Sequence, residues 1–516
     1  MSAYDQVLYP SHPHPQTHPD RLATVGALFG LRCAPVRHCR VLELGCGDGS
    51  NMVPMAWSNP ESEFLGVDLA ARPIAAGQQM IAELGLKNTR LTQDSILNLR
   101  PGWQEFDYII AHGLYSWVPA EVRQHLLALC RGCLAPTGMA FVSYAAYPGC
   151  HLRNMIREMM LFHVRGFDTP EERIPQATAL LRFLADAQEV PDEYRRCLKV
   201  ELDRVLEHDP GHLYHDDLAA VNQPFYFTQF MAEASRHSLQ YVGEADFFEM
   251  SDHVFTPSVR QMLEELSKNR ILREQYLDFL KCRRFRQTLL CRGAAQLAGK
   301  PVPEVVASFH VSSAIACPVQ PIDLRPGISA SFEAPRGAKA QTDFPLGKAC
   351  LLTLAEKGLI GVGFTPLLEE AKKRLQDTGL TMDSDAVLRG NLCEFLLRLY
   401  GAGVVDFRSS PALGTATPSQ TPLASPIARW QIRHGNIVTS LFHVAVQVED
   451  DIGRQLLSLL DGTRDREALA DALWQYLQAK DPSPTTESER SARRGTLESD
   501  LERNLVKLAR LGLLVA

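Results

Sequence analysis

Apolar and polar positions alternate in blocks through the first third of the chain. Apolar runs at 41–44, 64–67, 106–111 and 139–144 predict buried strands, and segments with apolar residues at helical spacing separate them. Ahead of these runs, PDRLATVGALFGL predicts a helix with Pro19 in its first turn. Strands and helices that alternate at this length are typical of a parallel sheet covered on both faces. We therefore expect an α/β, Rossmann-like fold.

Past residue 149 the strands are delayed by helical segments. A helix followed by a strand-like run is predicted around 225–242, and FRQTLLCR at 285–292 predicts a last strand. The apolar positions of that helix are Phe227, Phe230, Met231 and Ala234, and Tyr241 and Val242 lie in the strand. Residues 1–149 and 225–292 would then complete a seven-stranded sheet.

Two stretches remain outside that sheet, 150–224 and 250–280. We expect helical insertions near the ligand-binding edge, where insertions shape a substrate pocket or an oligomer contact such as a homodimer interface. The alternative is a separate helical domain spanning 150–292.

The C-terminal part contains a degenerate repeat. LLTLAEKG and LLSLLDGT each begin a unit, and LCEFLLRLYGAGVV and LERNLVKLARLGLLV each end one. At a constant offset, Leu392, Leu396, Leu399 and Gly403 correspond to Leu501, Leu505, Leu508 and Gly512. Helices that end in glycine before a strand predict two α+β, winged-helix-like units at 293–408 and 427–516. Between them, 409–426 is rich in Pro, Ser and Thr and predicts a flexible linker. Chance leucine spacing is the alternative.

Composition narrows the class of protein. The 516 residues are 45% hydrophobic and 22% charged, which favours neither disorder nor a membrane protein. The net charge of −7 offers no overall attraction for nucleic acid, although a local basic face stays open. The winged-helix-like units are not basic enough to require DNA, so we favour protein docking for them. The N-terminus lacks an apolar signal core, and we expect a cytoplasmic enzyme without membrane insertion.

Cysteine and histidine clusters raise the question of metal. Twelve cysteines fit a reducing compartment. Cys130 and Cys133 form a CxxC, yet their spacing places both thiols on the apolar stripe of one helix, and no second CxxC exists. The histidines of HPHPQTHP and HDPGHLYHDD lack a fixed ligand spacing. We expect no metal, and interpret these segments as a lid over a cofactor and a loop.

The strand at 41–44 runs into the turn GCGDG, with Glu43 two places before Gly45. Glycine lets backbone approach a ligand at the carboxyl edge of a parallel sheet. A carboxylate there would repel a pyrophosphate but would suit a positively charged ligand. S-adenosylmethionine, with its sulfonium and amino groups, fits this requirement. Asp68 closes the next strand and can accept from ribose hydroxyls, a role common to dinucleotide sites as well.

Further residues extend the predicted cofactor site. Asp94 follows a short strand, where it would accept from the adenine amino group or, alternatively, cap a turn. The expected cofactor-binding set is Glu43, Gly45, Cys46, Gly47, Asp68, Leu69, Asp94, Ser95, Ala111 and His112.

Through VLELGCGDG, GVDLA, QDSI, FDYIIAHGLYSWVP and GMAFVSY, the chain resembles the class I S-adenosylmethionine-dependent methyltransferases. More narrowly, YDQVLYP, THPDRLATVGALFGL and HDDLAAVNQPFYFTQFMAEASRHSLQYVGEADFFEM resemble the bacterial family that carries a methyltransferase regulatory domain. Some of its members are protein lysine methyltransferases that act on outer-membrane proteins. The resemblance implies a protein substrate. It departs at YAAYPGCH, where Ala145 and Cys150 replace an expected asparagine and tryptophan.

Direct SN2 methyl transfer needs orientation and desolvation rather than a covalent nucleophile. The candidates that orient the acceptor are His112, Tyr115, Trp117, Tyr144 and Tyr147. An aromatic channel would favour a neutral lysine amine, while the alternative for each residue is ordinary packing. No (N/D)PPY string follows the fourth strand, which counts against a DNA amine methylase.

Three hypotheses for function remain open. The first is a protein lysine methyltransferase whose C-terminal units present the target. The second is a methyltransferase for a small metabolite or RNA. The third is a non-catalytic scaffold that binds S-adenosylmethionine.

Overall fold

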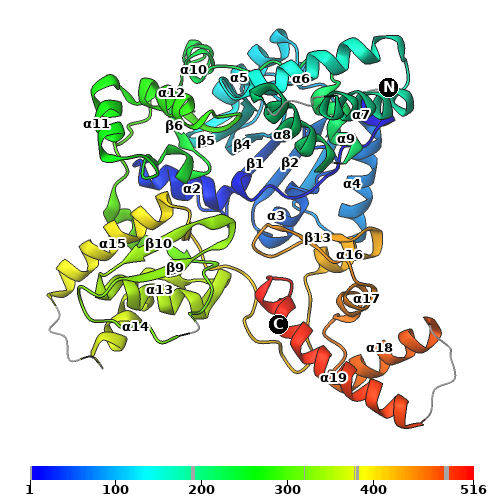
Figure 1. Cartoon of the computed structure of the whole chain (residues 1–516), viewed down its shortest axis with the longest axis vertical. Coiled ribbons are helices and arrows are strands. Elements are labelled where there is room, and N and C mark those ends of the chain that lie inside the picture. Colours follow the sequence, from blue (N-terminus) through cyan, green and yellow to red (C-terminus); the bar gives the residue numbers. More distant parts are fainter. Residues whose placement is uncertain are drawn as a thin grey trace.

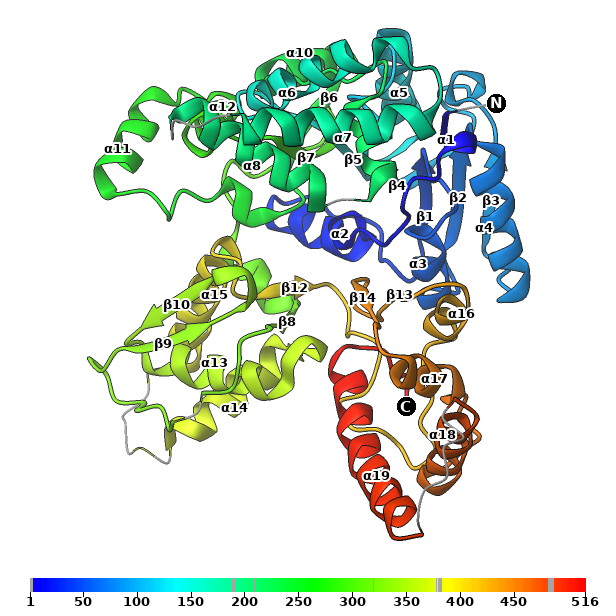
Figure 2. The same ribbon diagram turned by 45° about the vertical axis from the view of Figure 1, so that its right-hand side comes forward.

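The computed structural model describes residues 3–187, 192–207, 209–318, 320–376, 378, 383–480 and 487–516. His208, in the second histidine segment, lies outside these residues. Seven strands form one mixed sheet in the order β3-β2-β1-β4-β5-β7-β6, in which β7 is antiparallel to both neighbours (Figures 1 and 2). The strands are β1 Arg40–Leu44, β2 Glu63–Asp68, β3 Thr89–Gln93, β4 Phe106–Ala111, β5 Leu134–Ala145, β6 Leu239–Glu244 and β7 Phe285–Arg292. The seven-stranded Rossmann-like prediction is confirmed. Because β6 and β7 pair within this sheet, the alternative of a separate helical domain at 150–292 is wrong.

Helices cover both faces of the sheet because each strand sends alternate side chains to opposite sides. On β1, Val41 belongs to the core shared with α2, α3 and α4, whereas Leu42 and Leu44 belong to the core shared with α5 and α10. These helices are α2 Pro19–Leu28, α3 Met52–Ser58, α4 Ala71–Glu83, α5 Ala120–Cys133 and α10 Phe227–Arg236. Cys130 and Cys133 lie in this second core, as their helical spacing predicts. All twelve cysteines of the chain are free thiols.

The first insertion is helical and has a core of its own. It consists of α6 Cys150–His163, α7 Pro170–Asp186, α8 Glu193–Glu207, α9 Pro210–His212 and a π-helical turn at Leu213–Asp217. Ile156, Leu181 and Leu202 belong to its separate hydrophobic cluster. The segment predicted to be a loop, HDPGHLYHDD, is therefore helical over most of its described part.

The second insertion, α11 Pro257–Leu266 and α12 Arg270–Lys281, is attached to the sheet through a buried ion network. Arg286 of β7 has a fully buried side chain and contacts Glu244 of β6 at 2.5 Å, Asp278 of α12 at 2.9 Å and Glu274 of α12 at 3.1 Å. A buried guanidinium is tolerated only where carboxylates compensate its desolvation. The network therefore fixes α12 against the last two strands.

The middle unit has a three-stranded sheet in the order β11-β8-β12, with three helices packed around it. Its elements are β8 His310–Ser312, β9 Ala330–Glu333, β10 Lys339–Thr342, α13 Pro345–Lys357, β11 Val362–Gly363, α14 Phe364–Gln376, α15 Asp385–Gly401 and β12 Asp406–Arg408. The C-terminal unit contains α16 Pro426–His434, β13 Ile437–Thr439, β14 Ala445–Gln447, α17 Asp451–Leu459, α18 Arg466–Lys480 and α19 Glu487–Arg510.

The two units repeat one arrangement. In the C-terminal unit, Leu423 bridges Asp461 and Ala424 bridges Leu514, so one short segment lies between two others as β8 lies between β11 and β12. Gly403 and Gly512, which end the matched helices, both have φ near 70°. The leucine match therefore reflects a structural repeat rather than chance spacing.

The expectation of a flexible linker at 409–426 needs correction. Leu423 and Ala424 belong to the C-terminal unit, and α16 begins at Pro426. Upstream, the backbone of Ser409 donates to Asp20, and Arg466 donates to the carbonyl oxygen of Gln420. The segment is held because a Pro- and Ser-rich composition predicts a loop without predicting what that loop contacts.

The C-terminal unit lies against the large sheet domain, beside α3 and α4 (Figures 1 and 2). Ile427 of α16 packs with Val53 and Met80, and the Trp430 indole donates to Glu83 at 2.6 Å. None of the helices in the described ranges combines the length and apolar composition that a membrane crossing requires.

Candidate active site

The glycine turn between β1 and α3 lies at the carboxyl edge of the sheet. Gly45 and Gly47 adopt φ values of 75° and 55°, which side chains with a Cβ rarely adopt. The Gly45 amide donates to the Val67 carbonyl at 2.8 Å, so the turn is fixed to β2. It borders a cavity of about 1280 Å³. The predicted cofactor residues that line this cavity are Glu43, Gly45, Cys46, Gly47, Asp68, Leu69, Asp94, Ser95 and His112.

The Asp68 side chain connects the glycine turn to the start of α4 at this edge of the sheet. One carboxylate oxygen accepts from the Gly47 amide at 2.9 Å and the other from the Ala70 amide at 2.8 Å. Burial raises the pKa of this carboxyl, and the backbone donors oppose that rise. A carboxylate oxygen has more than one acceptor position, so Asp68 can still receive ribose hydroxyls.

Glu43 is the acid whose surroundings discriminate between ligands. It is 3% exposed, and its Oε1 accepts from the Asn51 amide at 2.7 Å. Its Oε2 is buried and has no hydrogen-bond partner in the described part of the chain. Burial raises the pKa of Glu43 to about 8, and the neighbouring Asp48 and Asp68 add to this, while the Asn51 hydrogen bond opposes it. A cationic donor would satisfy the orphaned oxygen, whereas a phosphate would not. The residues present therefore fit S-adenosylmethionine.

Asp94 combines the two roles considered from the sequence. Its Oδ1 accepts from the Ser95 amide and from the Asn98 side chain, both at 2.7 Å, which is a local cap. The residue also lines the cavity. A contact of Asp94 with adenine stays a prediction.

The residues predicted to orient the methyl acceptor lie at or after the ends of β4 and β5, and only some of them line the cavity. His112 and Trp117 line the cavity, and the indole Nε1 of Trp117 is buried with no acceptor among the described residues. The His112 ring stacks on His14, with centroids 3.8 Å apart. Burial lowers the pKa of His112 to about 4 and that of His14 to about 2, so both rings are neutral near pH 7. Methyl acceptors would therefore meet an uncharged aromatic wall.

The other candidates do not line the cavity. Tyr115 and Tyr144 belong to the aromatic core on the α5 face, where Tyr144 stacks on Phe230 at 4.1 Å and its hydroxyl contacts Thr288 at 3.2 Å. Tyr147 stacks on His151 at 4.1 Å. Ala111 is buried within β4. These four residues have their contacts elsewhere because the sequence pattern does not show which face of a strand end opens toward the ligand edge.

The N-terminal segment forms one wall of the cavity. It runs from α1 Ala3–Gln6, close to α4, toward α2 (Figure 2). The Tyr4 ring stacks on His215 of the first insertion at 4.1 Å, and the His215 Nε2 contacts the Val7 carbonyl oxygen at 2.7 Å. Its lining residues are Tyr4, Leu8, Tyr9, Pro10, Ser11, His12 and His14. The histidine-rich segment therefore borders the cavity, and its role as a lid over the cofactor stays a prediction.

Charged residues of the first insertion, together with Arg284 just before β7, also line the cavity. Sequence reasoning missed them. Arg153 contacts Asp217 at 2.6 Å and Asp216 at 3.8 Å, and Arg284 contacts Glu201 through two hydrogen bonds of 2.6 and 2.9 Å. Burial raises the pKa of Asp216 to about 6, so its carboxyl is still ionised at neutral pH. Ala145 and Cys150, the two departures from the expected family pattern, also border the cavity.

No group of three or more His, Cys, Asp or Glu side chains in the described ranges is placed to hold an ion.

The sheet order, the glycine turn and the buried acid beside it define a class I S-adenosylmethionine-dependent methyltransferase. Comparisons with known proteins agree. Residues 42–140 match the family described as methyltransferase domain, 209–292 the predicted methyltransferase regulatory domain, and 420–513 the C-terminal winged helix domain of PKMT. The last match confirms the winged-helix prediction for the C-terminal unit.

Similarity to two proteins extends over nearly the whole chain. The uncharacterized protein RP789 of Rickettsia prowazekii is 30% identical over 508 residues, which cover 97% of this chain and 90% of the relative. The structure of PKMT2 from Rickettsia typhi in complex with AdoHcy has a TM-score of 0.87 at 28% identity and covers 98% of this chain and 100% of that chain. A second relative, RP028 of Rickettsia prowazekii, is 38% identical over 235 residues, 45% of this chain and 94% of the relative. The chain therefore belongs to the class I S-adenosylmethionine-dependent methyltransferases that carry a methyltransferase regulatory domain, and S-adenosylmethionine is its cofactor.

Proposed function

We propose that this enzyme methylates lysine side chains of a protein by direct SN2 transfer, with its C-terminal winged-helix units presenting the target. The observation that carries the proposal is the similarity to PKMT2, a protein lysine methyltransferase by name, across the sheet, the insertions and the C-terminal units together. A cofactor-binding module shared with other methyltransferases would not extend so far.

The cavity supports an amine acceptor. Asp216, with a carboxylate 3.8 Å from Arg153, supplies negative charge on the insertion wall and would attract a lysine ammonium. Further in, the neutral rings of His14 and His112 and the Trp117 indole disfavour a charged amine, because desolvation lowers the pKa of a lysine. The bound cofactor supplies the electrophilic methyl group. The protein orients the neutral amine and excludes water from it.

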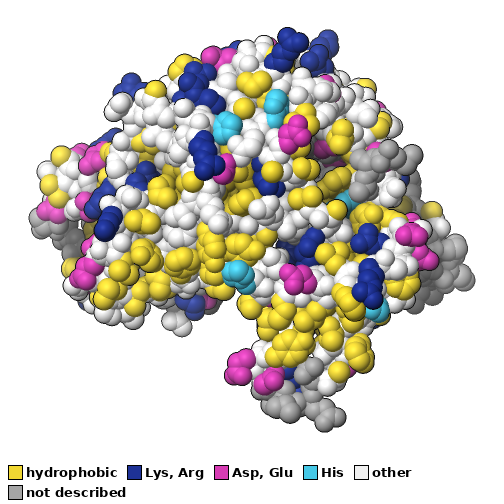
Figure 3. Space-filling view, turned by 90° about the horizontal axis from the view of Figure 1, so that it is seen from above, with side chains coloured by type: hydrophobic (Ala, Val, Ile, Leu, Met, Phe, Trp, Pro, Cys, Tyr) yellow, Lys and Arg dark blue, Asp and Glu magenta, His cyan; other side chains and the backbone are white. Residues whose placement is uncertain are grey.

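RNA fits these features less well. Tracts of Lys and Arg would be expected where a phosphate backbone binds, yet on the face drawn in Figure 3 basic side chains are scattered singly or in small groups among apolar and acidic ones. The net charge of −7 adds no general attraction. A tRNA (guanine-N(7)-)-methyltransferase of Chloroflexus aggregans is 41% identical over only 73 residues, 14% of this chain. That match is too short to include an acceptor site.

Label transfer tests the proposal. The enzyme is incubated with methyl-labelled S-adenosylmethionine and a whole-cell lysate, and the product is treated with protease or with ribonuclease. We expect the label to be released by protease and to resist ribonuclease. The matched control is Asp68→Ala, which removes both backbone anchors at the cofactor edge and should abolish transfer. Protease-resistant label would contradict a protein acceptor.

A further inference from the structure

One amide beside the cofactor site connects three distant parts of the chain. Asn51, 6% exposed, donates through Nδ2 to Glu43 Oε1 at 2.7 Å and to the Thr17 hydroxyl at 3.0 Å. Its Oδ1 accepts from the His14 amide at 2.8 Å and lies 3.0 Å from the Nε2 of His443. Only His443 comes from the C-terminal unit.

The other partners of Asn51 show which atom donates in the hydrogen bond between His443 and Asn51. The His14 backbone amide can only donate, so the atom that it faces is the amide oxygen. Glu43 Oε1 accepts, so the atom of Asn51 that it faces is the amide nitrogen. His443 must therefore donate through Nε2–H. Burial lowers the pKa of His443 well below its usual value, which leaves a neutral ring that can carry this proton.

The backbone of His443 is adapted to this reach. The residue lies in the turn between β13 and β14, has φ of 60° in the left-handed region, and is 5% exposed. A side chain with a Cβ adopts that conformation only at an energetic cost. The same turn is attached to the end of α19, where the Leu441 amide donates to the Gly512 carbonyl oxygen at 2.7 Å.

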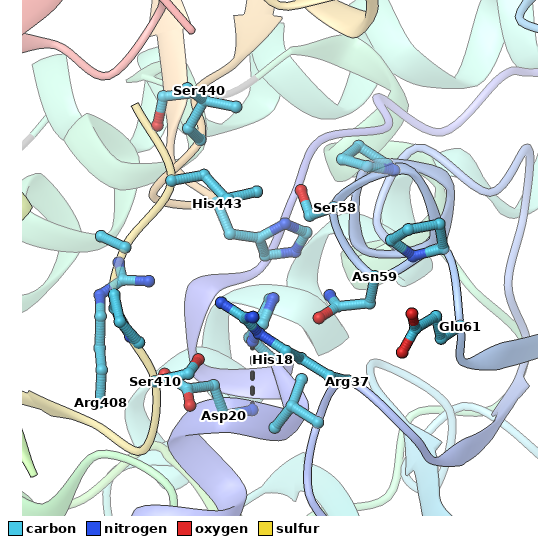
Figure 4. Close-up of a pocket in the computed structure, with 17 residues that line it drawn as sticks. His18, Asp20, Arg37, Ser58, Asn59, Glu61, Arg408, Ser410, Ser440 and His443 are labelled. Atoms are coloured by element: carbon cyan, nitrogen blue, oxygen red, sulfur yellow. Dashed lines mark hydrogen bonds between the residues drawn. The ribbon is translucent and has the colours of Figure 1, made fainter. Parts of the chain in front are cut away.

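The surroundings of the ring are a second, smaller pocket between the sheet domain and the C-terminal units, with a volume of about 270 Å³. In Figure 4 the His443 imidazole points into this pocket toward His18, and the two ring centroids are 5.3 Å apart. Arg408 and Asp20 line the same pocket. The imidazole therefore lies between the pocket and the amide that supports Glu43.

We propose that His443 is a positioning residue for the cofactor: through Asn51 it orients Glu43, so that the C-terminal winged-helix unit completes the S-adenosylmethionine site. The inference concerns the methyl donor only and holds whatever the acceptor is. A partner that moves the β13–β14 turn would then change cofactor affinity.

Three variants of His443 in the full chain separate this role from packing. His443→Phe keeps an aromatic ring without a donor, and His443→Asn suits a left-handed turn but is too short to reach Asn51. For both, the dissociation constant of S-adenosylmethionine measured by calorimetry should rise roughly three- to tenfold, the value of one buried hydrogen bond. His443→Gln, which can present an amide donor, should restore most of the affinity.

The control variant weakens the contact between the C-terminal unit and the sheet domain but leaves the hydrogen bonds among His443, Asn51 and Glu43 in place. Trp430→Phe removes a second hydrogen bond between the C-terminal unit and the sheet domain, the one to Glu83. It should lower the melting temperature and leave the cofactor dissociation constant unchanged. In a Glu43→Gln background, His443→Phe should add little further loss. Wild-type affinity in both His443→Phe and His443→Asn would overturn the proposal. So would a loss of cofactor affinity in His443→Gln and Trp430→Phe as large as the loss in His443→Phe.

Discussion

The two walls of the large cavity are built in different ways. The cofactor wall comes from residues 43–95, in which consecutive strand ends and turns place backbone amides and acids side by side. The opposite wall, called the acceptor wall below, combines the N-terminal segment, the segment after β4 that carries Trp117, the first insertion and the start of β7. These parts meet only in the folded chain. The cofactor wall binds a single kind of ligand, the cofactor, so its residues can come from one continuous stretch of the chain. The acceptor wall has to match an acceptor, and its charges are held by ion pairs between elements far apart in sequence.

The largest effect is expected from the acid of the cofactor wall. Glu43→Gln keeps the shape and the Asn51 contact but removes the charge that receives a cationic donor. A hydrogen bond to a charged group contributes about 1.5–3 kcal/mol, so the dissociation constant of S-adenosylmethionine should rise about ten- to hundredfold. Calorimetry measures it. An unchanged dissociation constant would contradict the assignment of cofactor binding to Glu43 and the cofactor wall.

The protonation of the same acid sharpens this prediction. With a pKa of about 8 in the folded protein without cofactor, Glu43 holds a proton at pH 7 that a cationic ligand must displace. Affinity should fall about tenfold per pH unit below pH 8, with release of about one proton at pH 7, measured by calorimetry in buffers of different ionisation enthalpy. Glu43→Gln should show neither effect.

The sign for stability follows from the same pKa. The unfolded carboxyl loses its proton near pH 4.5 and the folded one near pH 8. Between these values the folded state binds more protons, so the free energy of unfolding of the cofactor-free protein falls as pH rises. Glu43→Gln should flatten this slope in denaturant titrations.

A smaller effect should mark the acceptor wall. Trp117→Phe removes a buried indole donor that has no partner among the described residues. If the acceptor uses this donor, kcat/KM for the methyl acceptor should fall about three- to tenfold while the cofactor dissociation constant stays the same. The melting temperature should rise, because an unsatisfied buried group is lost. A change confined to cofactor binding would contradict the division between the walls.

No kinetic effect is expected from Tyr144→Phe. Its hydroxyl contacts Thr288 in the core and not the cavity, so the variant should lose about 1 kcal/mol of stability and keep its kinetic constants. Denaturant titration and initial rates check the two halves of this prediction. A large fall in kcat would return Tyr144 to the active site.

The sequence predicts the cofactor wall better than the acceptor wall. The strands, the glycine turn and the positions of Glu43, Asp68 and Asp94 at one edge follow from local patterns, because parallel strands end at the same side of a sheet. Tyr115 and Tyr144 could not be placed, since the pattern that marks a strand end does not distinguish the cavity side from the core.

Long-range contacts left no local signal. Arg286 stands in the strand FRQTLLCR, which contains no acid, and only the fold brings Glu244, Glu274 and Asp278 around it. His443 lies in a turn with nothing that points to the cofactor site. Both interactions depend on partners whose positions no spacing rule predicts.

Acid hydrolysis of the labelled product tests the central claim most directly. Protein from the lysate reaction is hydrolysed to amino acids, and the labelled species are separated by chromatography. We predict that the label elutes as methylated lysine and that Asp68→Ala yields none. Label recovered in a different amino acid, or in no amino acid at all, would contradict lysine as the methyl acceptor.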